Sequence, residues 1–167
     1  MNGSRTLIAR GERGVSLVEL VILMAVLSAA AAASIRSLED GTGVAPRVAA
    51  ERLARDIRYA QRLSMSRRGT CGVSVNAGNE TWTVFENSNA ADPVRDPATG
   101  FDLVATLGAD EFAGVRIAMA VFGVGSSVTF DVEGRPSTGG AVVIENSSGD
   151  SVTVTLLPET GLVRISP

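Results

Sequence analysis

Hydrophobic and polar positions divide the chain into three parts with different patterns. The first is an almost unbroken apolar run over 15–35, where 17 of 21 residues are apolar and Glu19 is the one charge. The second, 47–68, has apolar residues at helical spacing, and the third, 71–166, consists of short β-type runs separated by turn residues. These patterns predict an apolar helix, an amphipathic helix and an antiparallel β-region.

The apolar run is long enough to cross a membrane. A helix rises about 1.5 Å per residue, so 21 residues extend about 30 Å, the thickness of the hydrocarbon core of a bilayer. The segment before it, 1–14, carries three arginines and one glutamate. Positive charge on this side holds the N-terminus in the cytoplasm, so the remainder is expected on the far side of the membrane.

Three interpretations of the apolar run compete. In a secretory signal peptide, the small residues at 28–34 would form the cleavage site; in a plain signal anchor, the helix stays uncleaved. Neither interpretation explains Glu19, because a carboxylate within an apolar span costs about 3 kcal/mol and is usually functional. The third interpretation rests on Gly14-Val15-Ser16-Leu17-Val18-Glu19-Leu20, which resembles the type IV prepilin signature.

That resemblance implies a processing route and an assembly role. A prepilin peptidase would cut between Gly14 and Val15, and the new amine of Val15 would be methylated. Glu19 would then be the fifth residue of the mature chain. Val15 departs from the family pattern, which usually has Phe after the Gly. A buried Glu19 can pair with the terminal amine of a neighbouring subunit, and such pairing favours assembly of several chains.

The second part predicts an amphipathic helix over 47–68. Before it, the two glycines and Pro46 within 40–46 predict a kink or linker spanning 36–46. The apolar face of the helix is expected to pack on the β-region. Five arginines occupy the opposite arc, which is either a solvated helix face or a stripe that faces an anion or a partner. The stripe would comprise Arg47, Arg52, Arg55, Arg58 and Arg62, with Arg164 near the C-terminus.

The third part predicts a β-sandwich or twisted antiparallel sheets over 71–166. Turn residues at 76–79 and 147–150 predict two hairpins. The fold class is therefore α+β, with a long N-terminal helix, kinked near 40–46, packed on a C-terminal antiparallel β-sandwich. The expected strands are 71–75, 81–85, 101–107, 115–122, 128–132, 141–145, 152–156 and 162–165.

Several segments of the helix and β-region resemble minor pseudopilins of the GspH/FimT type. The segments are Leu53–Asp56, Ala60, Val73–Val75, Trp82, Phe130–Pro136 and the terminal Gly161–Ile165. The resemblance implies a leader at 1–14, a transmembrane assembly helix at 15–35 and a periplasmic domain at 47–167. It also implies single-pass anchoring in the inner membrane. The implied partners are other major and minor pseudopilins and the prepilin peptidase/N-methyltransferase.

The implied function is that of a structural subunit of a type II secretion-like pseudopilus, involved in protein export across the outer membrane. A minor type IV pilin of the FimT type, acting in DNA uptake or pilus assembly, is the alternative. A Sec-exported β-sandwich without an assembly role is a further alternative. DNA binding ranks second because 15–167 contains 12 arginines against 17 acidic residues, and binding at physiological salt needs several phosphate contacts.

Composition argues against an enzyme, a cofactor and a metal site. The chain has no histidine, the usual general base and commonest transition-metal ligand. Its single cysteine, Cys71, excludes an internal disulfide and is expected to be a small buried hydrophobe. Asp92, Asp96 and Asp102 border a Pro/Gly-rich loop without EF-hand spacing, so a solvated loop is expected there.

Overall fold

The computed structural model describes residues 21, 22, 24, 25 and 44–167. The chain divides into two compact units, Met1–Glu39 and Asp40–Pro167. In the first unit, the four described residues are helical and exposed. Most of the predicted apolar span, including Gly14, Val15 and Glu19, lies outside the described residues. Over the part of the chain that is described, no helix combines the length and apolarity needed to cross a membrane.

The second unit begins with a 24-residue helix, α2 (Val44–Arg67). It starts three residues before the predicted start because Pro46 falls in the first turn, where a missing N–H has no intrahelical acceptor to lose. It ends because Arg68 adopts a left-handed backbone with φ of 52°, and the Gly69 amide donates to the Ser64 carbonyl at 3.2 Å. The predicted amphipathic helix is therefore confirmed with its boundaries shifted.

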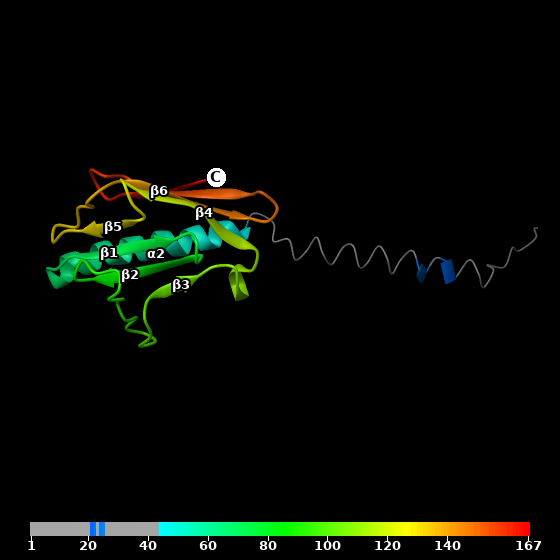
Figure 1. Cartoon of the computed structure of the whole chain (residues 1–167), viewed down its shortest axis with the longest axis horizontal. Coiled ribbons are helices and arrows are strands. Elements are labelled where there is room, and N and C mark those ends of the chain that lie inside the picture. Colours follow the sequence, from blue (N-terminus) through cyan, green and yellow to red (C-terminus); the bar gives the residue numbers. More distant parts are fainter. Residues whose placement is uncertain (1–20, 23, 26–43) are drawn as a thin grey trace, which may run out of the picture. The chain divides into compact units, whose positions relative to one another are not determined.

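Eight strands form two four-stranded antiparallel sheets (Figure 1). The first sheet has the order β3-β2-β1-β5 and the second has the order β4-β6-β7-β8. Both predicted hairpins are confirmed, as β1/β2 and β6/β7. The strands are β1 (Cys71–Asn76), β2 (Thr81–Glu86), β3 (Val104–Thr106), β4 (Val115–Phe122), β5 (Ser127–Phe130), β6 (Gly140–Asn146), β7 (Ser151–Leu156) and β8 (Val163–Ser166).

Two differences from the expected strands matter for the surface. The run 101–107 forms a strand only at β3, so Phe101 and Asp102 belong to the preceding loop. A short 3₁₀ helix, η1 (Asp110–Phe112), was not predicted and follows β3. Order along the chain does not follow order in space either, because β4 joins the second sheet, β5 returns to the first, and β6 returns to the second.

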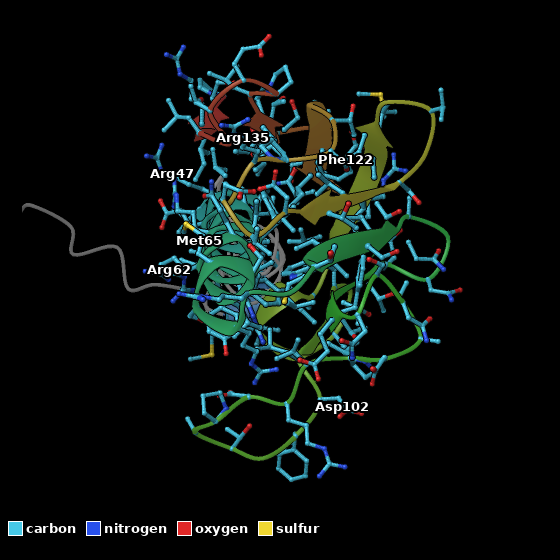
Figure 2. The ribbon with its side chains drawn as sticks, turned by 90° about the vertical axis from the view of Figure 1, so that its left-hand side faces the viewer. Arg47, Arg62, Met65, Asp102, Phe122 and Arg135 are labelled. Atoms are coloured by element: carbon cyan, nitrogen blue, oxygen red, sulfur yellow. The ribbon has the colours of Figure 1, made fainter. Side chains whose placement is uncertain are left out.

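One core serves the helix and both sheets. The buried face of α2 includes Leu53 and Ile57, which share a hydrophobic cluster with strand residues of both sheets. Figure 2 views α2 nearly end-on, with Arg47, Arg62 and Met65 projecting on the side away from the strands. The α+β class and the packing of one helix on antiparallel sheets are therefore confirmed.

Close packing between β1 and its neighbours depends on Gly72. A Cβ atom at this position would lie 2.3 Å from the Val128 carbonyl oxygen and 2.6 Å from the Phe85 ring. Both distances are far below van der Waals contact, so only glycine fits. Gly72 thus lets β1 lie between β2 and β5 while the Phe85 ring covers it.

We expect Leu53→Ala to lower the free energy of unfolding of residues 40–167 by about 2–5 kcal/mol, the usual cost of emptying a core site. Leu53 is fully buried, whereas Val48 on the same helix is 44% exposed and provides the matched control Val48→Ala. Urea unfolding monitored by circular dichroism measures both. Equal losses in the two variants would contradict the packing described for α2.

Candidate functional site

The structure separates the five arginines of the predicted helical stripe. Arg47 pairs with Glu51 one turn along the helix at 3.2 Å. Arg52 pairs with Glu111 of η1 at 2.9 Å, and its guanidinium carbon lies 5.7 Å from the centre of the Phe112 ring. Arg58 instead points toward the second sheet, where it donates to the Val163 carbonyl of β8 at 3.1 Å.

The remaining predicted arginines lie on two different surfaces. Arg55 and Arg62 line a cleft beside α2, together with Arg52. Arg164 is exposed on β8, on the side of α2 approached by Arg58. The stripe is therefore two surfaces, one along the cleft and one at the edge near β8.

The cleft lies between α2 and the segment 96–105 and has a volume of about 540 Å³. Its helix wall is mostly cationic, and its opposite wall combines two aspartates with apolar residues. Figure 2 labels one residue from each wall, Arg62 on α2 and Asp102 on the loop. The lining residues are Arg52, Arg55, Asp56, Tyr59, Arg62, Asp96, Pro97, Thr99, Asp102, Leu103, Val104 and Ala105.

A partly buried hydrogen bond joins the helix wall to the first sheet. The indole Nε1 of Trp82, the one tryptophan of the chain, donates to Asp56 Oδ2 at 2.7 Å. Burial raises the pKa of Asp56 above its ordinary 3.8, against the opposing effects of this hydrogen bond and of Arg52 and Arg55. Sequence reasoning missed this pair, although a carboxylate on the buried side of an amphipathic pattern is a detectable signal.

The opposite wall of the cleft is a tightly bonded turn. The Ala98 amide donates to Asp96 Oδ1 at 2.8 Å, and the Thr99 hydroxyl donates to Asp96 Oδ2 at 3.2 Å. The Leu103 amide donates to the Val94 carbonyl at 2.7 Å, so the two ends of the loop are joined next to β2. Within residues 44–167 no group of three or more Cys, Asp or Glu side chains is placed to hold a metal ion.

Two loops are fixed against the C-terminal half of α2. Gln61 Nε2 donates to the Gly134 carbonyl at 2.8 Å. Gly134 and Gly161 have φ of 78° and 66°, and a Cβ on Gly161 would lie 2.4 Å from Gln61 Nε2. The left-handed backbone at Gly134 and Gly161 favours glycine at both positions. These loops contain the segments 130–136 and 161–165 that carry the family resemblance. Sequence reasoning did not identify Gln61.

Cys71 is a buried thiol at the start of β1. Burial raises the pKa of Cys71, and the nearby Glu86 carboxylate raises it further. Both effects disfavour the thiolate, which is the reactive form of cysteine. The position therefore fits the predicted packing role.

The sequence profile described as type II transport protein GspH matches residues 49–160. The match spans most of α2 and seven of the eight strands. The chain belongs to the GspH family. A comparison with curated protein sequences gives no match.

Solved structures share the fold of this GspH-family domain. The minor pseudopilin EpsH from the type 2 secretion system of Vibrio cholerae aligns with a TM-score of 0.55 and 13% identity, covering 72% of this chain and 95% of that one. The type IV minor pilin FimU of Pseudomonas aeruginosa aligns with a TM-score of 0.52 and 16% identity, covering 73% and 88%. At these identities the likeness establishes the fold.

The raised pKa of Asp56 predicts a pH-dependent stability. Where the folded pKa exceeds the unfolded one, the group favours folding at low pH, and this contribution is lost as pH rises through the folded pKa. Asp56→Asn removes the titration. Its stability relative to the wild type should therefore rise as the pH increases from the ordinary value of 3.8 through the raised pKa of Asp56.

Urea unfolding of residues 40–167 at several pH values, monitored by circular dichroism, measures this difference. Glu133→Gln removes an exposed carboxylate and controls for the loss of one negative charge. A stability difference between Asp56→Asn and wild type that is constant with pH would contradict the inferred effect of burial.

Proposed function

We propose that the chain is a minor pseudopilin, a structural subunit of the pseudopilus of a type II secretion system that exports proteins across the outer membrane. The observation that carries the proposal is the GspH-family match over 49–160. The apolar run with Glu19, placed directly before this domain in the sequence, supports it independently. The subunit assembles with other pilin-like subunits.

The proposed route begins at the inner membrane. The leader 1–14 stays in the cytoplasm, and the helix 15–35 anchors the chain with the domain 47–167 in the periplasm. Prepilin peptidase removes the leader after Gly14, and the amine of Val15 is methylated. Glu19 then pairs with the terminal amine of a neighbouring subunit. This pairing favours incorporation of the subunit into the pseudopilus over a single unassembled subunit in the membrane.

The proposed role is structural and non-enzymatic. A subunit of a fibre needs a rigid domain and surfaces that fit its neighbours, and the shared core of α2 and both sheets provides that rigidity. Asp56 and Cys71, which have shifted pKa values, contribute to packing in this view.

A minor type IV pilin acting in DNA uptake or pilus assembly is the second candidate. EpsH and FimU share the fold about equally with this chain, so the fold favours neither. Charge favours secretion, because 44–167 contains 11 arginines against 14 acidic residues and Arg52, Arg67 and Arg116 pair with glutamates. A Sec-exported domain without an assembly role is the third candidate function, because that interpretation gives Glu19 no role.

Processing tests the proposal directly. We expect the mature chain isolated from its own bacterium to begin at N-methylated Val15. Mass spectrometry of the N-terminal peptide measures this, and Gly14→Ala, which alters the residue before the cut, should retain the leader. A mature chain that begins near Ser34 would indicate ordinary signal peptidase and contradict the pseudopilin assignment.

Glu19 tests the assembly step separately. Glu19→Val should leave membrane insertion intact, because it removes a charge that costs about 3 kcal/mol in an apolar span. The variant should fail to co-purify with other pilin-like subunits, since the amine of the neighbour loses its partner. Membrane fractionation and crosslinking measure the two effects, with Glu12→Gln in the leader as a control. Wild-type assembly of Glu19→Val would exclude the pairing.

A further inference from the structure

The cleft beside α2 presents an ordered row of side chains. Arg52, Arg55, Tyr59 and Arg62 recur every three to four residues, which places them on one face of the helix. Ten residues separate the first arginine from the last, so the row extends about 15 Å along the helix axis. A row of this length matches a short peptide segment better than a single small ion.

Most charges around the cleft already have partners. Arg52 pairs with Glu111, Asp96 accepts hydrogen bonds within its own turn, and Asp102 lies 3.9 Å from Arg95. Asp56 accepts from Trp82 at 2.7 Å. Within the described domain, the side chains of Arg55 and Arg62 have neither an ion pair nor a hydrogen bond. The cleft therefore has two guanidinium groups with unused donors.

We propose that this cleft binds a carboxylate-bearing segment of a neighbouring protein subunit. Arg55 and Arg62 bind the carboxylates, since guanidinium groups donate two parallel hydrogen bonds to such groups. Tyr59 and the apolar Leu103 pack against the aliphatic or aromatic remainder of the segment. The identification of the neighbour as another pilin-like subunit rests on the proposed function.

The mixed walls favour protein over nucleic acid. A phosphate chain would pass Asp96 and Asp102, which repel it, and would find only two arginines with unused donors. Nucleic-acid binding at physiological salt requires several phosphate contacts. A protein segment that carries carboxylates, apolar groups and backbone donors matches the arginines, the apolar residues and the aspartates together.

The loop tip adds an aromatic group next to the cleft. Phe101 is 77% exposed and lies between the lining residues Thr99 and Asp102 in the sequence. Its backbone carbonyl accepts from the Asp96 amide at 2.8 Å, so the turn fixes its position. Phenylalanine and arginine are both enriched in protein interfaces relative to the rest of the protein surface.

Crosslinking in the bacterium that produces the chain tests the proposal. The full chain carries a photoreactive benzoylphenylalanine in place of Tyr59, and crosslinked peptides are sequenced by mass spectrometry. The expected product joins the cleft to an Asp- or Glu-containing peptide of another pilin-like subunit. Arg55→Glu and Arg62→Glu should each lower its yield by up to about fivefold, the limit for a partly exposed ion pair.

Two controls establish the cause of any loss. Arg135→Glu makes the same charge change on the loop that contacts Gln61 and should leave the yield unchanged. Circular dichroism of each purified full chain verifies folding. Changing the crosslinked acidic residue of the partner to arginine should restore the yield with Arg55→Glu or Arg62→Glu, which a merely structural effect would not do.

The remaining outcomes overturn one proposal or the other. A nuclease-sensitive product, a partner peptide without carboxylates, or a yield insensitive to both arginine variants overturns the cleft proposal. A chain processed at Val15 and assembled, yet lacking the crosslink, overturns the cleft proposal alone. An unprocessed chain that still gives the acidic crosslink overturns the pseudopilin assignment alone, and an unprocessed chain without it overturns both.

Discussion

Burial of one face of α2 against two separate sheets is the constraint on which the domain depends. Leu53 and Ile57 are fully buried in a cluster that includes strand residues from both sheets. Without the helix, each four-stranded sheet would expose that part of its apolar face to water. The same packing leaves the side of α2 next to segment 96–105 accessible, and Arg55 and Arg62 lie there. The helix thus sets both the core and the location of the candidate interface.

Patterns within short segments predicted much of this fold. The helical spacing of apolar residues over 47–68 identified the buried face of α2, and turn residues located both hairpins. The start of α2 was misplaced because Pro46 disrupts a helix interior but is accepted in a first turn. The strand expected at 101–107 is short because the Asp96 turn, which binds its own loop, extends through Phe101.

The candidate site depended on contacts that a local pattern does not contain. The arginine arc was predicted, but its division was not, because Arg58 bonds to a carbonyl 105 residues away. Arg52 likewise finds Glu111 on a 3₁₀ helix that no periodicity indicated. The cleft exists because segment 96–105 lies beside α2, which is a tertiary arrangement. The Gly14–Glu19 motif remains a prediction, since it lies outside the described residues.

The separation between α2 and its last partner strand has a consequence for folding kinetics. Chain synthesis proceeds from the N-terminus, so α2 emerges about 100 residues before β8, the last strand of the second sheet. The part of the apolar face of α2 that packs on β6, β7 and β8 therefore stays uncovered until these last strands arrive. Domains dominated by such distant contacts fold slowly and expose aggregation-prone surface meanwhile.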